Sequence, residues 1–136
     1  MRTLAAILTA LSLTITLALP AQASQDIRDI IGDQMEDLRR GDFASAFDHA
    51  SPGIRNYFGS VENFETMLRG GYPMVIGPRE YFFLADRPET EQRQVQPVQV
   101  EDQGGRLFTL EYFMLRTDTG WKIDAVRLMD VAKPSV

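Results

Sequence analysis

His49 is the only histidine in the 136-residue chain, and histidine is the residue type best suited to proton transfer near neutral pH. It acts as a general base where a neighbouring carboxylate orients its ring. A single histidine excludes a two-histidine metal site. Its position within Phe47-Asp48-His49-Ala50, at the end of a predicted helix, is more typical of a structural histidine that serves the last helical carbonyls. We therefore predict no catalytic residue and keep His49 as a candidate ligand contact.

Two tyrosines and an arginine complete the candidate ligand-binding set. Tyr57 and Tyr72 can donate hydrogen bonds from their hydroxyl groups, and both lie in or just after the helical half of the chain. Arg79 can present its guanidinium group to a carboxylate on the ligand. Each residue also has a structural alternative, which is core packing for a tyrosine and an ion pair or a solvated position for the arginine. The set predicts a small ligand that is uncharged or anionic.

The sequence lacks the motifs of several enzyme classes. It has no glycine-rich phosphate loop, no nucleophilic serine elbow and no cluster of metal-ligating residues. Phosphoryl transfer and metal-dependent hydrolysis are therefore disfavoured, and we predict neither a cofactor nor a metal. There is also no cysteine, so packing rather than disulfides must stabilise the fold.

Acidic residues outnumber basic ones, with 19 Asp and Glu against 14 Lys and Arg and a formal net charge of -5. The densest acidic group lies on the first predicted helix, where it is more typical of a solvated helix face than of a metal site. An acidic chain is repelled by polyanions. This charge balance therefore disfavours nucleic acid and anionic membranes as partners.

Residues 1–23 have the pattern of a secretory signal peptide. A positive start and an uncharged run over residues 4–19 precede a small-x-small cleavage site at residues 21–23. The alternative is a membrane-anchoring helix. Such a helix needs about 20 apolar residues, and the uncharged run of residues 4–19 is shorter than this, so a cleaved signal peptide is favoured. We expect a mature chain of residues 24–136 that begins with Ser24 and forms one domain. It should be periplasmic or secreted, with no stable membrane insertion after cleavage.

Apolar residues at three- and four-residue steps predict helices in the first half of the mature chain. Residues 25–40 form an amphipathic helix that ends at Gly41, where glycine suits the left-handed cap conformation. Further helical segments follow, the last over residues 61–68. Each of them starts after a residue type that caps helix N-termini, namely Asp42, Ser51 (followed by Pro52) and Ser60.

Runs of aromatic and β-branched residues separated by turn residues predict strands at residues 80–85, 93–100, 106–116 and 121–129. Pro97 predicts an edge or a bulge in the second strand. If the last strand is regular, Ile123 and Ala125 share one face and Val126 lies on the other. The pattern predicts an α+β fold with three N-terminal helices on a curved antiparallel sheet of about four strands. The open end of such a cone-shaped fold is a place for a small ligand.

Two sets of residues carry a family resemblance. A long strand, a turn and then Trp121-Lys122-Ile123 close the chain, and the helical half contains the segments Ala50-Ser51-Pro52-Gly53-Ile54, Tyr57-Phe58-Gly59 and Gly71-Tyr72-Pro73. The first pattern resembles the nuclear transport factor 2-like superfamily, also called ketosteroid-isomerase-like or SnoaL-like. The second is similar to a bacterial family catalogued as a domain of unknown function, number 4864. The resemblance implies a cone-shaped scaffold that hosts isomerases, dehydratases, cyclases and plain binding domains.

Three function classes remain open. The first is an exported domain that binds a small apolar or anionic ligand in the cone, or a protein partner on the sheet, and the missing catalytic motifs favour it over an enzyme. The second is a cofactor-independent isomerase, dehydratase or cyclase, which needs only a base and a donor in a dry pocket. The third is an envelope protein without a ligand. Apolar residues on both faces of residues 107–115 predict a homodimer through the open face of the sheet, as the resemblance also implies.

Overall fold

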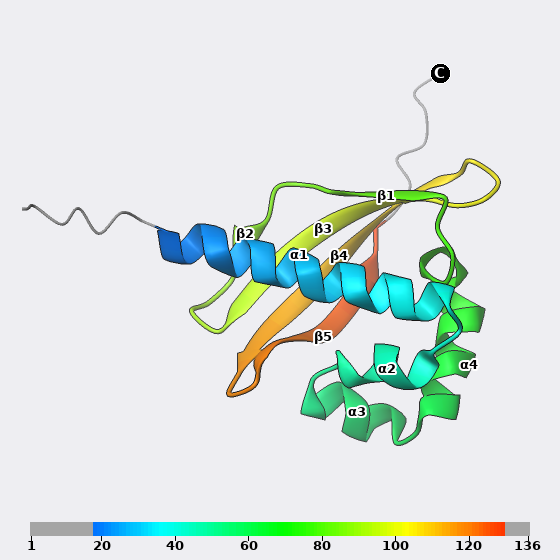
Figure 1. The fold of residues 1–136 in the computed structure, drawn as a ribbon, viewed down its shortest axis with the longest axis horizontal. Helices are drawn as coiled ribbons and strands as arrows, with labels where there is room; N and C mark the ends of the chain where they lie inside the picture. The colour runs from blue at the N-terminus through cyan, green and yellow to red at the C-terminus, as the bar shows by residue number, and fades with distance from the viewer. Residues whose placement is uncertain (1–17, 130–136) are drawn as a thin grey trace, which may run out of the picture.

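The computed structural model describes residues 18–129, in which helices precede strands (Figure 1). The helical part comprises α1 (Ala18–Arg39), α2 (Phe43–Asp48), α3 (Pro52–Phe58), α4 (Val61–Gly71) and the short 3-10 helix η1 (Pro73–Val75). The strands are β1 (Glu80–Phe83), β2 (Arg87–Pro88), β3 (Arg93–Glu101), β4 (Leu107–Thr117) and β5 (Gly120–Leu128). All strand pairs are antiparallel, in the order β1-β3-β4-β5, with β2 also paired to β3. The predicted α+β fold class is confirmed.

Helix α1 buries one apolar stripe and exposes most of its acidic residues, although Asp37 is buried. Four side chains at successive turns are almost completely buried, namely Ile27, Ile31, Met35 and Leu38. Their spacing of three or four residues keeps them on one side of the helix. Gly41 follows with a φ of 73°, the left-handed conformation predicted for the residue that stops this helix.

The caps predicted for the later helices are also present. The side chains of Asp42, Ser51 and Ser60 each accept a hydrogen bond from the backbone N–H three residues further on. This bond satisfies one of the donors that every helix N-terminus leaves free. The segment after Ser51 closes as a helix of its own, so the described chain contains four α-helices before η1 rather than three.

Pro97 does not place its strand at an edge of the sheet. Strand β3 pairs with β4 on one side and with β1 and β2 on the other. Pro97 lies between the segment that pairs with β1 and the segment that pairs with β2. The proline is accommodated because the chain on this side is interrupted between β1 and β2, and the Pro97 carbonyl there accepts hydrogen bonds from the N–H of Leu84 and the side-chain amide of Gln96.

The last strand is not regular, so the predicted assignment of its side chains to the two faces of the sheet is wrong. The register of β4 and β5 shifts between Phe113 and Met114, so that Met114 pairs with Ile123 and Tyr112 pairs with Val126. Tyr112 and Met114 are two residues apart and share the buried face of β4. Val126 therefore lies on the same side as Ile123, whereas strict alternation predicts opposite sides. An extra residue in one strand of an antiparallel pair has this effect.

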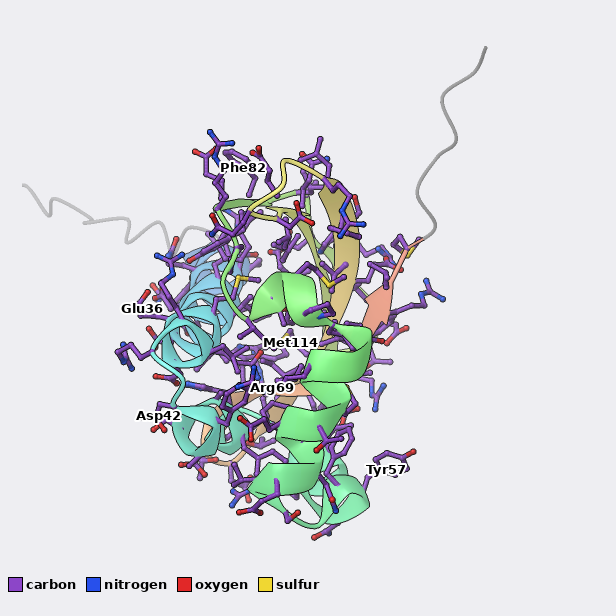
Figure 2. The ribbon with its side chains drawn as sticks, turned by 90° about the vertical axis from the view of Figure 1, so that its right-hand side faces the viewer. Glu36, Asp42, Tyr57, Arg69, Phe82 and Met114 are labelled. Carbon is purple, nitrogen blue, oxygen red and sulfur yellow. The ribbon has the colours of Figure 1, made fainter. Side chains whose placement is uncertain are left out.

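The helices cover one face of the sheet. Helix α1 runs across that face, and α2, α3 and α4 gather beside one end of it (Figure 1). Figure 2 shows Met114 in the interior between the helices and the sheet. The core formed there includes the α1 stripe, Val98 and Val100 of β3, and Leu110 and Tyr112 of β4.

The opposite, open face of the sheet is partly covered by arginine side chains. Val95 opposes Phe113 on this face and is nevertheless only 1% exposed. Arg87 and Arg127 both form ion pairs with the buried carboxylate of Glu111, and Arg127 also lies over the Phe113 ring. The aliphatic stems of paired arginines can cover apolar surface while the charged ends reach solvent.

Most of the predicted signal peptide lies outside the described residues. Its last part, Ala18 to Ala23, forms the first turns of α1, and Ala23 is buried. The predicted cleavage site therefore lies inside a continuous helix, one and a half turns after the first described residue. None of the described helices is long and apolar enough to cross a membrane.

Candidate functional site

A cavity of about 360 Å³ lies between α3, α4 and the last two strands. Helices α3 and α4 contribute Ile54, Tyr57, Phe58, Phe64, Met67 and Leu68, and the segment after α4 contributes Tyr72 and, from η1, Val75. Gln34, Ala50, Tyr112, Ile123, Ala125 and Val126 complete the lining. The walls are mostly apolar, with a few polar groups, as in typical ligand-binding pockets.

The segment before α3 holds this helix beside the sheet. The N–H of Ile123 donates to the carbonyl of His49 at 2.8 Å, and the N–H of Ser51 donates to the carbonyl of Ile123 at 2.9 Å. These two bonds attach the chain to the outer side of β5. Helix α3 then has no fully buried residue of its own, because it stands over the cavity rather than against a filled core.

Tyr112 is the most deeply buried polar side chain of the lining. The residue is 1% exposed, and its hydroxyl group forms no hydrogen bond within residues 18–129. No fully buried side-chain oxygen or nitrogen of these residues lacks a partner, so the hydroxyl group is open to the cavity. Burial, and to a lesser extent the nearby Tyr81, raises the pKa of the Tyr112 hydroxyl above its ordinary value. Tyr112 is therefore a neutral hydroxyl that can donate to a bound molecule at any physiological pH.

Gln34 supplies the second polar group. Its side-chain nitrogen donates to the carbonyl of Ala46 at 3.1 Å, which fixes the amide at the interface of α1 and α2. No described donor bonds to its side-chain oxygen, although the residue is only 6% exposed. No fully buried side-chain oxygen or nitrogen of residues 18–129 lacks a partner, so this oxygen is open to the cavity that Gln34 lines. This oxygen can accept a hydrogen bond from a molecule in the cavity.

The two tyrosines predicted from the sequence differ in their placement. The Tyr72 hydroxyl donates to the carbonyl of Val126 at 3.1 Å, so it links the loop after α4 to β5 across the cavity wall. Tyr57 contributes to the lining, but its side chain is 80% exposed and extends away from the molecule (Figure 2). Tyr72 is thus part of the wall, and Tyr57 lies at the rim.

His49 does not line the cavity. Its Nε2 atom lies 3.0 Å from a carboxylate oxygen of Asp37, whose other oxygen accepts a hydrogen bond from Arg40 at 2.5 Å. The histidine therefore links α2 to α1 rather than serving the last carbonyls of its own helix with its ring. A histidine and a carboxylate are paired as catalysis requires, but no cavity adjoins them among those found in the described residues.

Arg79 is also separate from the cavity. Its guanidinium group lies 3.7 Å from the carboxylate of Glu101, and its backbone N–H donates to the carbonyl of the same residue. The arginine side chain is 63% exposed. The structure therefore places Arg79 in an ion pair at the start of the sheet, and of the four predicted site residues it brings only Tyr57 and Tyr72 to the cavity.

A family model described as a domain of unknown function (DUF4864) matches residues 20–136. The chain belongs to this family. No curated protein and no solved structure matches the chain.

The cavity of this DUF4864 domain contains no charged residue in its lining. Within residues 18–129 there is likewise no group of three or more residues able to hold a metal ion. Chemically, the cavity offers apolar walls, one free hydroxyl and one free amide oxygen. These features suit the binding of an uncharged molecule, because burying an ion here leaves its charge without a partner.

The sequence did not indicate Gln34 or Tyr112 as site residues. Gln34 lies on the predicted helix of residues 25–40 as one polar residue among several, and Tyr112 lies in a strand where aromatic residues usually form core. A polar residue at a core-facing position of an amphipathic helix is the only signal that points to Gln34. For Tyr112 of the DUF4864 domain, only the folded chain shows that the hydroxyl group forms no hydrogen bond within residues 18–129.

Proposed function

We propose that this protein binds a small, uncharged and mostly apolar molecule in the cavity between α3, α4, β4 and β5. The observation that carries the proposal is the combination of an apolar lining with two polar groups that are open to the cavity and form no hydrogen bond within residues 18–129, the Tyr112 hydroxyl and the Gln34 amide oxygen. A ligand that forms one hydrogen bond with each group gains affinity and orientation from both contacts.

The size and charge of the cavity narrow the ligand class. A volume of about 360 Å³ is at the small end of the ~300–1,000 Å³ usual for small-molecule pockets. The absence of charge from the lining disfavours the anionic ligands that an arginine anchor would hold. Small aromatic alcohols and short-chain alcohols or ketones fit these limits better than fatty acids or aromatic acids.

Binding is favoured over proton-transfer catalysis by the composition of the lining. An isomerase, dehydratase or cyclase needs a general base within hydrogen-bonding reach of the substrate. The lining residues include no carboxylate and no histidine, and the neutral Tyr112 hydroxyl is a donor rather than a base. The proposed role is therefore that of a non-enzymatic binding domain.

We also infer membership of the nuclear transport factor 2-like superfamily. Support comes from the order of helices before an antiparallel sheet, and from the cavity between the helices and the last two strands. The superfamily hosts both binding proteins and enzymes, so this inference supports the place of the ligand and not its identity.

The proposed place of action is outside the cytoplasm, in the periplasm or the surrounding medium. The support is the order of positive charge, uncharged run and small-x-small site in residues 1–23. N-terminal sequencing of the protein purified from the cell envelope tests the export. Ser24 as the first residue is expected, and an intact Met1 in the membrane fraction would contradict it.

A thermal-shift screen tests the binding. The panel contains small alcohols, phenols, ketones and steroids, together with matched carboxylic acids, and we expect only uncharged compounds to raise the melting temperature. Met67→Trp, which fills the cavity from α4, should abolish the shift. Glu62→Trp is the matched control, because it adds the same side chain to the exposed side of the same helix. A shift that survives Met67→Trp would place the ligand elsewhere.

Two tyrosine variants then test the polar contacts. Tyr112→Phe removes the free hydroxyl and should weaken binding of a hydroxyl-bearing ligand by roughly 5- to 10-fold, since one hydrogen bond contributes about 1 kcal/mol. Tyr72→Phe removes a hydroxyl that is already bonded to Val126 and should leave the affinity within about twofold. Equal affinity in wild type and Tyr112→Phe would contradict the assignment of Tyr112.

A further inference from the structure

Asp86 forms a half-buried polar cluster with α1 at the predicted cleavage site. Its side-chain oxygen accepts a hydrogen bond from the Ser24 hydroxyl at 2.5 Å and another from the side-chain amide of Gln94 at 2.6 Å. The Gln94 amide also lies 3.4 Å from the Ser24 hydroxyl. Ser24 thus meets Asp86, which is 62 residues further along the chain, and Gln94 around one carboxylate oxygen.

No cation neutralises this carboxylate in the described chain. The ion pairs of residues 18–129 involve many of the other acidic side chains, but none of them includes Asp86. The neutral partners Ser24 and Gln94 provide its hydrogen bonds instead. A partly buried carboxylate of this kind is stabilised further by any positive charge placed next to it.

Cleavage after Ala23 creates such a charge at the right residue. Hydrolysis of the Ala23–Ser24 peptide bond by water leaves a carboxylate on Ala23 and a free α-amino group on Ser24, which takes up a proton near neutral pH. This α-ammonium belongs to the residue whose hydroxyl already contacts Asp86. In the uncleaved chain the same nitrogen is a neutral amide within α1.

We propose that the Asp86 carboxylate, supported by Gln94, is the docking site for the α-ammonium group of Ser24 in the cleaved protein. The site receives a cation that only proteolytic processing produces, and it ties the start of α1 to the segment before β2. A bare α-ammonium at a helix N-terminus is repelled by the helix dipole. Asp86 offsets this repulsion. The inference rests on the proposed export for its biological setting, and the docking itself is a property of the chain of residues 24–136.

The test is a comparison of N-terminal acetylation in two backgrounds. A chain that starts at Ser24 is prepared with a free or an acetylated amino terminus, in wild type and in Asp86→Asn. Acetylation removes the positive charge, so in wild type it should lower the melting temperature by about 2–5 °C through loss of the ion pair. In Asp86→Asn only the helix-dipole effect remains, and acetylation should raise the melting temperature or leave it unchanged. The same response in both backgrounds would overturn the proposal.

Asp26→Asn is the matched control, because Asp26 is an exposed carboxylate in the same helical turn. Acetylation should destabilise this variant as it does wild type, and a lost response would overturn the assignment to Asp86.

A measurement without any variant covers the case in which Asp86→Asn fails to fold. An NMR titration should find the α-ammonium pKa above its ordinary range of about 7.7–8.0, and an unshifted pKa overturns the docking. N-terminal sequencing of the exported protein separately determines the cleavage position. A first residue other than Ser24 also overturns the proposed docking.

Discussion

The Ser51 hydroxyl donates a hydrogen bond to a carboxylate oxygen of Asp124 at 2.7 Å, while it accepts one from the N–H of Ile54 at 3.3 Å. One buried hydroxyl therefore caps α3 and connects this helix to β5. Asp124 in turn forms an ion pair with Arg93 of β3. The helix that stands over the cavity is fixed to the sheet by this chain of polar contacts.

Ser51→Ala should destabilise the fold by about 1–3 kcal/mol. Loss of the cap accounts for about 1 kcal/mol, and loss of a buried donor to a carboxylate adds a further cost. Ser60→Ala is the matched control, because Ser60 caps α4 at an exposed site without a second partner, and it should cost only about 1 kcal/mol. Urea unfolding measures both variants, and equal costs would show that the Asp124 contact contributes nothing.

The two cavity tyrosines should differ in their effect on the free protein. Tyr72→Phe loses the hydrogen bond to the Val126 carbonyl and should reduce the free energy of unfolding by roughly 0.5–1.5 kcal/mol. Tyr112→Phe removes a hydroxyl without a described partner and should change stability by less than about 0.5 kcal/mol, or stabilise the protein. Thermal unfolding without ligand checks the order. A large loss of stability in Tyr112→Phe would mean that this hydroxyl has a partner.

His49→Ala should affect stability and not ligand binding. The imidazole bonds to Asp37 across the interface of α1 and α2, away from the cavity lining, so its loss leaves a partly buried carboxylate with one partner fewer. We expect a cost of roughly 1–3 kcal/mol. A ligand found in the thermal-shift screen should bind the folded variant with unchanged affinity. A loss of ligand affinity in a stably folded His49→Ala variant would show that His49 belongs to the binding site.

Glu111 should make stability depend on acidic pH. The hydrogen bond from Arg127, and then the bond and charge of Arg87, lower the pKa of Glu111 from its ordinary value of 4.5, against the opposing effect of burial. A carboxyl group with a lower pKa in the folded state stabilises the protein above its unfolded pKa, and the contribution disappears as the pH falls through the folded pKa.

Glu111→Gln should therefore cost roughly 1–3 kcal/mol at pH 7, and the difference from wild type should shrink as the pH falls below about 4. Urea unfolding at a series of pH values measures this. Glu89→Gln, at an exposed position without an ion pair in the described chain, should show no such dependence. A difference between wild type and Glu111→Gln that stays constant with pH would contradict the role of the ion pairs.

The homodimer predicted from the sequence remains a proposal. Leu115 and Phe113 are half-buried on the open face of β4, next to the Glu111 ion pairs, and a second copy could cover them. Light scattering at tens of micromolar should give the mass of a dimer for wild type and of a monomer for Leu115→Glu. Tyr57→Glu, at an exposed position on α3, is the control and should stay dimeric. A monomeric wild type would exclude this interface.

The local structure of the chain was largely predictable because its signals act over a few residues. Asp42, Ser51 and Ser60 bond to backbone groups three residues away, so their caps can be found in the sequence without knowledge of the fold. The hairpin turn before β4 is another case, since Asp102 accepts hydrogen bonds from the N–H groups of Gly104 and Arg106.

The same reasoning failed at Pro97 and in β5, where the outcome depends on neighbouring strands. Proline usually indicates an edge, but here the chain on one side of β3 is interrupted between β1 and β2, beside Pro97. Strict alternation usually assigns the faces of a strand, but the register shift beside Met114 brings Val126 to the side of Ile123. Neither feature has a signal in the residues of the strand itself.

The sequence by itself determined the α+β class, the caps and the family, because periodicity and side-chain chemistry fix local backbone structure. Only the tertiary structure decided which residues share the cavity. It paired His49 with Asp37 and Arg79 with Glu101, and it brought Gln34 and Tyr112 to one space. Whether a polar group is satisfied depends on contacts between residues that are distant in the chain, and those contacts form only when the helices pack on the sheet.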